Sequence, residues 1–447
     1  MARAALRGSH VGSSPPEPLL TALSGPITLS HMEEFAPVNE QMDEIRRGVL
    51  EIIPEEDLAR KLERSARDNK PLLIKQGFDP TRPDLHIGHA VSIRKLRAFQ
   101  ELGHQVVFVV GSYTARIGDP SGRSETRPKL SADEIDANAR TYAEQVGRIL
   151  DLDRVRIDYN STWLAPLDLA RILELTATYT VARMLERDDF AKRYQEQRPI
   201  ALSEFLYPLM QAYDSVALAA DVELGGTDQK FNLLVGRTVQ ERYGQEPQVC
   251  LIMPLLRGTD GLQKMSKSYD NYIGISEPPE EQFGKTMSIP DDLLEEWYRL
   301  AIPLEASELE GALRQVRDDP YRAKRALGRR IVSLFHDVAA ADAAEAHFNR
   351  LFKDHSAPED MPEVEIALSD DRLRFEAEAG VRLIGLVVAA GLATSNGEAG
   401  RLIEQGAISI DEQRVTDRQA NVPVVAGQTV TLRRGKRHFA RVRFLAI

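Results

Sequence analysis

The chain has 447 residues, of which 43% are hydrophobic and 28% are charged. This composition is typical of a soluble globular protein of about three domains. The single cysteine, Cys250, excludes an intramolecular disulfide and a metal site made of cysteines alone, and it suits a reducing compartment. The longest apolar run, residues 384–393, is shorter than the roughly 18 residues of a membrane-spanning helix, so we expect no membrane association.

The two ends of the chain differ from its middle. The net charge is −11, but residues 381–447 carry ten Lys and Arg against five Asp and Glu, which gives them +5 and leaves −16 for residues 1–380. A basic tail on an acidic protein indicates docking to a polyanion, and a chance surplus on a solvent-exposed hairpin is the alternative. Residues 1–40 show no sustained periodicity and predict a disordered extension, with Met32 as an alternative start.

From residue 71 onward the pattern indicates an α/β fold. Leu72–Ile74 and Gln105–Val110 predict buried strands on either side of a helix from about residue 86 to residue 102. Strand, helix and strand in this order indicate a parallel sheet flanked by helices. Further helices are expected over 133–150, 167–187 and 204–218, and almost throughout 279–352.

The C-terminal tail carries sequence signals for a linker, a short helix and several strands. Residues 353–378 are rich in Pro and acidic residues and predict a linker. Ser395-Asn396-Gly397-Glu398 is typical of a capping box before a short helix. Strands are expected around 407–410 and 429–432, followed by a basic turn at 433–437 that leads into 438–444.

The first candidate catalytic motif is His86-Ile87-Gly88-His89, at the start of a predicted helix. Histidines three residues apart share one helix face, and a helix N-terminus adds free N–H groups and a positive dipole end that suit phosphate. Gly88 leaves room for a flat ring to approach the backbone. The alternatives are a surface histidine pair and half of a zinc site, which would need further ligands.

The second motif is Lys264-Met265-Ser266-Lys267-Ser268. Two lysines in a loop of small residues can move onto a phosphate chain and neutralise the charge that develops on a departing pyrophosphate. A solvated lysine loop is the alternative. The chain has neither a Gly-x-Ser-x-Gly nucleophile elbow nor a Gly-x-x-x-x-Gly-Lys-Ser/Thr phosphate loop, so it does not bind ATP as motor or kinase-like ATPases do.

In this order the two motifs resemble the signature pair of class I aminoacyl-tRNA synthetases, and their surroundings are similar to the bacterial tyrosyl-tRNA synthetases. The resemblance extends from about residue 71 to residue 447, and its C-terminal part is similar to a small RNA-binding module first known from a ribosomal protein. Its other markers are Gly77-Phe78-Asp79-Pro80, Gly118-Asp119-Pro120-Ser121-Gly122, Gln211-Ala212-Tyr213-Asp214 and Gly225-Gly226-Thr227-Asp228-Gln229.

The resemblance implies a domain order and a reaction. A doubly wound, Rossmann-like parallel-sheet catalytic domain would occupy 41–276, with an insertion at about 130–198 that forms a homodimer interface. A helical anticodon-binding domain (277–352) and a small α+β RNA-binding domain (379–447) would follow. The implied enzyme is a cytoplasmic tyrosine–tRNA ligase, which converts L-tyrosine and ATP to tyrosyl-adenylate and pyrophosphate and then charges tRNA(Tyr). Mg²⁺ would accompany ATP without a dedicated protein metal site.

The resemblance also implies roles for single residues. The substrate carboxylate attacks the α-phosphate, so catalysis needs positioning and charge stabilisation rather than a protein nucleophile. Asp214 would accept the phenolic hydrogen bond, and such a site rejects phenylalanine because its polar groups would be left unpaired. The implied phosphate and ATP contacts are Asp79, His86, Gly88, His89, Lys264 and Lys267. The implied tyrosine contacts are Thr114, Asp119, Tyr207, Gln211, Asp214 and Gln229, and the implied tRNA contacts are Arg433, Arg434, Lys436 and Arg437.

Two alternatives stay open. Many family members carry a tyrosine two residues before the glycine at Gly77, where it binds the substrate hydroxyl, but this chain has Lys75. The second contact to the hydroxyl is therefore unassigned, and Lys75 could instead pair with a buried carboxylate. The competing functions are a tryptophanyl-tRNA synthetase, against which Asp214 and the basic tail argue, and a non-catalytic RNA-binding protein, against which the intact histidine and lysine motifs argue.

Overall fold

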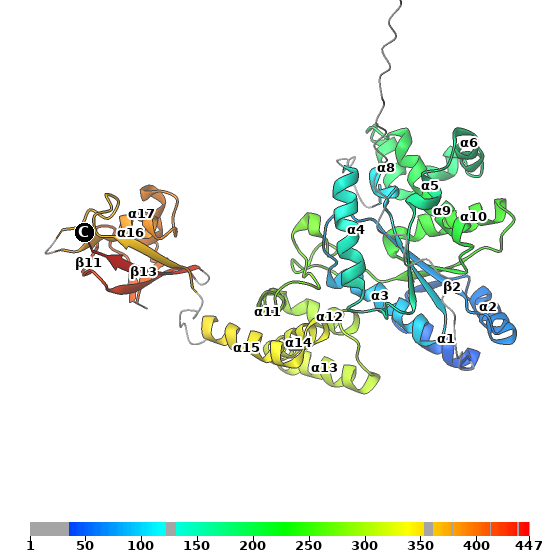
Figure 1. Cartoon of the computed structure of the whole chain (residues 1–447). Helices are drawn as coiled ribbons and strands as arrows, with labels where there is room; N and C mark the ends of the chain where they lie inside the picture. Colours follow the sequence, from blue (N-terminus) through cyan, green and yellow to red (C-terminus); the bar gives the residue numbers. More distant parts are fainter. Residues whose placement is uncertain are drawn as a thin grey trace, which may run out of the picture. The chain divides into compact units, whose positions relative to one another are not determined.

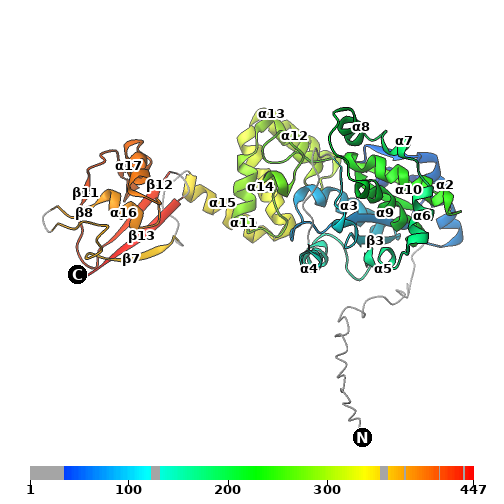
Figure 2. The same ribbon diagram turned by 90° about the horizontal axis from the view of Figure 1, so that it is seen from above.

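A computed structural model describes residues 35–121, 131–352, 361–376, 379–411, 413–435 and 438–446. These residues form two compact units, one within 1–84 and 89–255 and the other within 85–88 and 256–447. Figures 1 and 2 show their elements in two views at right angles. Across the described ranges, we find no helix with the length and apolarity needed to traverse a bilayer.

The first unit is built on a sheet with strand order β1-β6-β5-β2-β3-β4. Neighbouring strands are parallel except β1, which runs antiparallel to β6. The predicted strand at Gln105–Val110 is confirmed, and its apolar run is buried because helices cover both faces of a parallel sheet. The strands are β1 (Glu51–Ile53), β2 (Leu73–Phe78), β3 (Gln105–Val110), β4 (Val155–Tyr159), β5 (Val222–Gly226) and β6 (Val249–Met253).

The strand order reverses at β2, which has β3 on one side and β5 on the other. In open α/β sheets, ligands bind outside the carboxyl ends of the strands at such a reversal. Asp79 follows β2 directly and Gly225-Gly226 ends β5, so both predicted motifs lie at this edge. The expected doubly wound catalytic domain is confirmed.

The helices of the first unit cover this sheet. α9 packs against α10 and β2, and α10 also packs against β5 and β6. The buried Lys95 of α3 donates to the Glu44 carbonyl of α1 at 2.7 Å. The helices are α1 (Val38–Arg46), α2 (Glu55–Asp68), α3 (Ile87–Glu101), α4 (Ala132–Val146), α5 (Ser161–Leu164), α6 (Leu169–Ala177), α7 (Val181–Met184), α8 (Asp188–Gln195), α9 (Leu202–Leu218) and α10 (Lys230–Arg242).

The N-terminal boundary of the ordered structure differs from the expectation. Helix α1 begins at Val38, inside the segment 1–40 that was expected to be disordered. Met42 and Ile45 are buried, so α1 is held by packing that its short sequence pattern did not reveal. Residues 1–34 lie outside the described residues.

In the second unit, the predicted helical character of 279–352 is confirmed. Trp297 and Phe283 are fully buried among these helices, and Asp319 caps α14 by accepting from the Arg322 N–H at 3.0 Å. The helices are α11 (Pro279–Ser288), α12 (Leu294–Leu300), α13 (Ala306–Asp318), α14 (Pro320–Phe335) and α15 (Val338–Phe352).

The C-terminal module has a sheet of order β10-β9-β12-β13-β7 and a second ladder, β11-β8. β7 lies inside the segment 353–378 that was expected to be a linker; its pairing with β13 and the burial of Ile366 make it part of the module. Residues 353–360 and 377–378 lie outside the described residues. The elements are β7 (Glu363–Ala367), β8 (Val381–Arg382), α16 (Leu383–Ala389), α17 (Asn396–Glu404), β9 (Ile408–Ile410), β10 (Gln413–Val415), β11 (Asn421–Val422), β12 (Thr429–Arg434) and β13 (His438–Leu445).

Candidate active site

A carboxylate stands at the carboxyl end of β2. Asp79 accepts a hydrogen bond from Thr114 Oγ1 at 2.7 Å and another from the Tyr207 hydroxyl at 2.9 Å. Gly111 permits this arrangement, because a Cβ at that position would lie 2.0 Å from Asp79 Oδ1. The structure therefore brings together three residues that the sequence assigned to the site. Thr114 and Tyr207 are buried while Asp79 is only half-buried.

A second carboxylate, Asp119, anchors a chain of amides. It follows Gly118, whose φ of +83° favours glycine, and accepts from Gln229 Nε2 at 2.8 Å. The buried Asn232 donates to Gln229 Oε1 and to Gln211 Oε1, each at 3.0 Å. The structure thus connects Asp119, Gln229 and Gln211 in one network, which suits a substrate ammonium group.

Arg187, which sequence reasoning missed, supports this network. Its buried guanidinium donates to Ser121 Oγ at 2.5 Å and to Asn232 Oδ1 at 3.2 Å, and it lies 3.7 Å from Asp119 Oδ1. It also pairs with Asp189 at 2.7 Å. Arg187 precedes α8 in a charged stretch, so nothing in its local pattern distinguishes it from a surface arginine.

Asp214 on α9 is almost completely buried, with 3% of its surface exposed. Trp163 Nε1 donates to one carboxylate oxygen at 2.7 Å and Asn160 Nδ2 to the other at 3.2 Å. Asn160 also reaches Thr114 Oγ1 at 3.1 Å, which links Asp214 to the Asp79 group. Burial raises the pKa of Asp214 to about 7, and the positive charge of Lys75 opposes this rise.

Lys75 pairs with a buried carboxylate, as one of the two alternatives for it anticipated. Its Nζ lies 3.0 Å from Glu223 Oε1 on the adjacent strand β5, and both side chains are only 1% exposed. Glu223 was missed, although a glutamate inside the apolar run Val222–Leu224 was a signal, because a buried charge requires a partner.

The first of the two sequence motifs, at 86–89, starts in the second unit. The segment at 85–88 pairs with the chain at 273–275 through backbone hydrogen bonds, from the Ile87 N–H to the Ile273 carbonyl and from the Ile275 N–H to the Leu85 carbonyl, each at 3.0 Å. The Gly88 N–H points at Met265 Sδ at 3.4 Å, and a Cβ on Gly88 would lie 3.4 Å from Met265 Cβ. The two sequence motifs therefore touch at Gly88.

The lysine motif is organised by Asn271, another missed residue. The buried Asn271 accepts from the Ser266 N–H at 2.7 Å and donates to the Lys264 carbonyl at 3.2 Å and to Asp260 Oδ2 at 2.9 Å. These bonds shape the backbone that carries Lys264 and Lys267, whose side chains are half-buried. No local pattern marks Asn271, because its partners lie 5 to 11 residues earlier in the chain.

His89 belongs to the first unit, one turn into α3. Its ring meets Phe78 edge-on, with ring centroids 6.0 Å apart, and its carbonyl accepts from Ser92 Oγ at 3.1 Å. Phe78 ends β2, so His89 stands beside the strand that leads to Asp79. The joint action of His89 and the two lysines remains a prediction.

The predicted tRNA contacts differ in whether their side chains are already engaged within the C-terminal module. Arg434 is used within the C-terminal module, where it donates to the Leu392 carbonyl at 2.8 Å and pairs with Glu398 at 3.1 Å. Arg433 has no side-chain hydrogen bond or ion pair among the residues that the structure describes. Lys436 and Arg437 lie outside the described residues.

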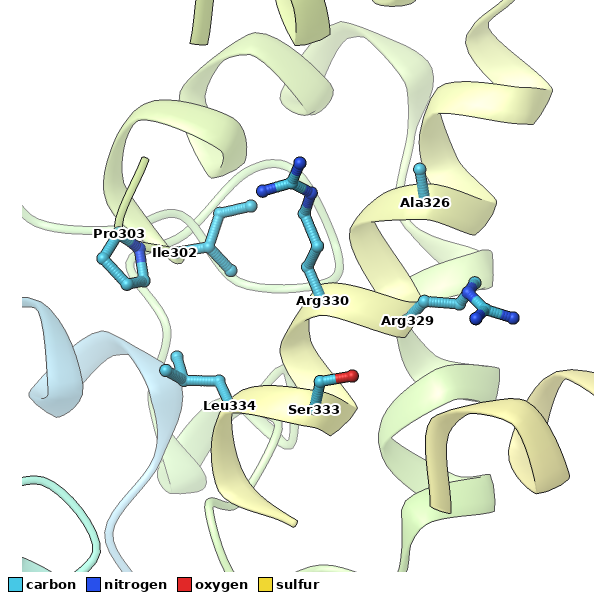
Figure 3. A pocket seen from close by; sticks show the side chains of 7 residues that line it. All are labelled: Ile302, Pro303, Ala326, Arg329, Arg330, Ser333 and Leu334. Atoms are coloured by element: carbon cyan, nitrogen blue, oxygen red, sulfur yellow. The ribbon is translucent and has the colours of Figure 1, made fainter. Parts of the chain in front are cut away.

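A separate hollow of about 430 Å³ lies between the end of α12 and α14 (Figure 3). Arg329 on its wall is paired with Glu345 at 2.6 Å. No residue that the sequence assigned to the site lines it. The lining consists of Ile302, Pro303, Ala326, Arg329, Arg330, Ser333 and Leu334.

Comparison with known proteins decides the family. Residues 67–353 match the family described as tRNA synthetases class I (W and Y), and residues 356–442 match the tyrosine–tRNA ligase SYY-like C-terminal domain. The chain is 55% identical over 408 residues to the tyrosine–tRNA ligase of Moorella thermoacetica, which covers 91% of this chain and 96% of that relative. The chain belongs to the tyrosine–tRNA ligase family.

A further relative and two solved structures are also similar to this chain. The Geobacter sulfurreducens tyrosine–tRNA ligase is 50% identical over 410 residues, covering 91% of this chain and 99% of its own. The fold is similar to a tyrosyl-tRNA synthetase from Archaeoglobus fulgidus solved with L-tyrosine, with a TM-score of 0.57 and 23% identity over 68% of this chain and 99% of that chain. A mitochondrial tyrosyl-tRNA synthetase from Aspergillus nidulans gives a TM-score of 0.57 at 24% identity, over 70% of this chain and 94% of that one.

We expect Asp214→Asn to change the pH dependence of stability. Burial raises the Asp214 pKa from 3.8 to about 7, so between these values the folded protein holds a proton that the unfolded chain releases, and wild-type stability falls as the pH rises. The variant lacks this contribution. Its free energy of unfolding relative to wild type should therefore rise by a few kcal/mol from about pH 4 to about pH 7.

Denaturant unfolding of both proteins across this pH range measures the difference. The asparagine amide also faces the two donors Trp163 and Asn160, which adds a penalty that does not depend on pH. A constant offset between the two curves would contradict the assignment of the raised pKa to Asp214.

Proposed function

We propose that this chain activates L-tyrosine with ATP and transfers it to the 3′ end of tRNA(Tyr). The observation that supports this most directly is Asp214, a buried carboxylate held by Trp163 and Asn160 at the binding edge of the sheet. A carboxylate in that position suits the hydrogen of a phenolic hydroxyl and is a poor neighbour for the apolar face of an indole. It therefore favours tyrosine over tryptophan as the substrate.

In the proposed pocket, the amino acid lies between two polar ends. Asp119, Gln229, Gln211, Tyr207 and Thr114 would surround its ammonium group, and Asp214 would accept from its hydroxyl. Asp119 is negatively charged and half-buried, so the ammonium group of the substrate can reach it and the two charges balance each other. Asp79 would stand between this pocket and the adenylate.

The proposed chemistry needs no protein nucleophile. An oxygen of the substrate carboxylate attacks the α-phosphorus of ATP. The bond from that phosphorus to the oxygen that bridges the α- and β-phosphates breaks, and pyrophosphate leaves with its negative charge. His86, His89, Lys264 and Lys267 would donate to the phosphate oxygens as this charge develops. Mg²⁺ would enter with ATP as part of the substrate. A ribose hydroxyl of the tRNA 3′ end then attacks the carbonyl carbon of the adenylate and AMP leaves.

The first test is ATP–pyrophosphate exchange with tyrosine, phenylalanine and tryptophan in parallel. We expect exchange with tyrosine alone in the wild type. His89→Ala should reduce tyrosine-dependent exchange by roughly 100-fold or more, because a positioned donor to the transition state is lost, while binding of tRNA(Tyr) stays within about twofold. Exchange with tryptophan, or no exchange from folded protein, would contradict the proposed function.

The C-terminal module would hold tRNA through its basic surface. Arg433 lies on β12 and makes no side-chain hydrogen bond or ion pair within the described part of the module, whereas Arg434 is engaged with Leu392 and Glu398. Arg433 is thus available for a phosphate, and Lys436 and Arg437 follow it in the sequence. The proposed location is the cytoplasm, which the single, buried Cys250 suits.

Arg433→Ala should weaken tRNA(Tyr) binding and reduce the slope of log K against log salt by about one, because one phosphate contact is lost. The matched control is Arg418→Ala, since Arg418 is exposed but already paired with Glu404 at 3.2 Å. Filter binding or fluorescence titration between low and moderate salt measures both. Equal slopes for wild type and Arg433→Ala would exclude Arg433 as a phosphate contact.

A homodimer is proposed because apolar side chains are exposed on neighbouring helices of the insertion. Leu169 and Leu173 on α6 are 71% and 60% exposed, and Val181 on α7 is 63% exposed. Scattered exposed leucines are common, but several on consecutive helices mark an interface. These residues lie in the segment that the family resemblance assigns to the dimer.

Leu173→Glu should weaken the dimer by about tenfold or more, because it places a charge in an apolar contact. Val338→Glu is the control, since Val338 is 63% exposed on α15, outside the insertion. Sedimentation equilibrium of the three proteins at micromolar concentration compares their dissociation constants. An unchanged constant for Leu173→Glu would remove α6 from the interface.

A further inference from the structure

We propose that the ammonium group of Lys75 is the second protein contact to the phenolic hydroxyl of tyrosine, donating to the oxygen whose own hydrogen Asp214 accepts. This inference rests on the proposed function and adds a specificity-determining residue to it. It assigns a binding task to a side chain that otherwise only balances the charge of Glu223.

The first argument is the hydrogen-bonding capacity of Lys75. An ammonium group has three N–H donors. The structure gives Nζ two acceptors, Glu223 Oε1 at 3.0 Å and the Gln211 carbonyl at 3.3 Å, and no third among the described residues. The side chain is 1% exposed, so bulk water cannot easily serve the remaining donor. A buried donor without a partner is costly, which suits a position completed by a ligand.

The second argument is position. Gln211 and Asp214 are three residues apart on α9 and therefore share one face. The carbonyl of a helical residue points along the axis toward the residues three and four positions later. An ammonium on the Gln211 carbonyl consequently lies beside the turn that carries Asp214. Ser215, the residue after Asp214, donates from its Oγ to Glu223 Oε2 at 3.3 Å. The Lys75–Glu223 pair therefore lies against this same turn of α9.

The third argument is that hydrogen bonds hold both the Lys75–Glu223 pair and Asp214 in place. Glu223 accepts from Lys75, from Gln211 Nε2 at 3.1 Å, from Ser215 Oγ and from Gln248 Nε2, and this anchors the ion pair. Asp214 is held by one donor on each oxygen, and each oxygen keeps a further lone pair. Burial is the main cause of the raised pKa of Asp214, and the charge of Lys75 is the largest of the effects that lower it, which is consistent with their proximity.

A phenolic hydroxyl is both a donor and an acceptor, and the two side chains offer the complementary acceptor and donor. Phenylalanine would leave both side chains without this partner, so each contact contributes to its rejection. 4-Aminophenylalanine separates the two contacts. Its amine can donate to Asp214, but its nitrogen is a poor acceptor for an ammonium.

The test is the charge-neutral double variant Lys75→Met with Glu223→Gln, which removes the donor without leaving a buried charge. Tyrosine-dependent pyrophosphate exchange measures kcat/KM for tyrosine, phenylalanine and 4-aminophenylalanine. We expect the preference for tyrosine over each analogue to fall roughly 10- to 100-fold, mainly through a higher KM for tyrosine. Lys75→Gln with Glu223→Gln is the second variant if the first does not fold, and its weaker donor should give a smaller loss.

The control is Lys61→Met with Asp221→Asn, which removes another ion pair, 3.1 Å long, with a buried lysine. It should lower the melting temperature and leave amino-acid preference unchanged. If wild type shows no tyrosine-dependent exchange, the proposed function itself fails. If wild type exchanges and the folded Lys75 variants keep both preferences, the proposal for Lys75 alone is overturned.

Discussion

The proposed tyrosine pocket depends on a pair of charges removed from water. Lys75 on β2 and Glu223 on β5 are each 1% exposed, and Glu223 also accepts from two side chains of α9. Breaking such a pair on one side costs about 3–5 kcal/mol, because the remaining charge is buried without a partner. The pair therefore fixes how α9 lies over the sheet, and with it the positions of Gln211 and Asp214.

Around this pair, polar side chains support one another before any substrate arrives. Asn160 joins Thr114 to Asp214, and Arg187 joins Ser121 to Asn232. The supporting residues are buried. Among the residues proposed to contact the substrate, Asp214 and Thr114 are buried as well, while Asp79 and Gln229 are half-buried. A site built this way is preorganised, so substrate binding completes hydrogen bonds rather than rearranging them.

The two candidate phosphate motifs meet where Met265 contacts Gly88. The segment at 85–88 forms a short antiparallel contact with 273–275, and Met265 of the lysine motif rests on Gly88. The contact between 85–88 and 273–275 is made by main-chain atoms and tolerates changes of side chain, whereas the contact at Gly88 uses the Met265 side chain. A Cβ at position 88 would lie 3.0 Å from His86 Nδ1 and 3.4 Å from Met265 Cβ, so a larger side chain there would crowd this contact.

Local pattern determined much of this protein. The apolar run Gln105–Val110, the helix after the first histidine motif and the helices of 279–352 were predictable because periodicity and burial act over neighbouring residues. The family and the identity of its motif residues were also readable from the sequence, and membership of the tyrosine–tRNA ligase family is confirmed.

Only the tertiary structure decided which side chains meet. Glu223 was visible as a charge in an apolar strand, but its pairing with Lys75 follows from β2 and β5 being neighbours, an order that neither strand encodes alone. In the sequence, Arg187 and Trp163 look like any residues near a helix end. The fold places Arg187 beside Ser121 and Trp163 beside Asp214. β7 likewise joins the C-terminal sheet through pairing with a strand far along the chain. Long-range pairing depends on strand order and register, and these are properties of the whole packed core rather than of any one segment.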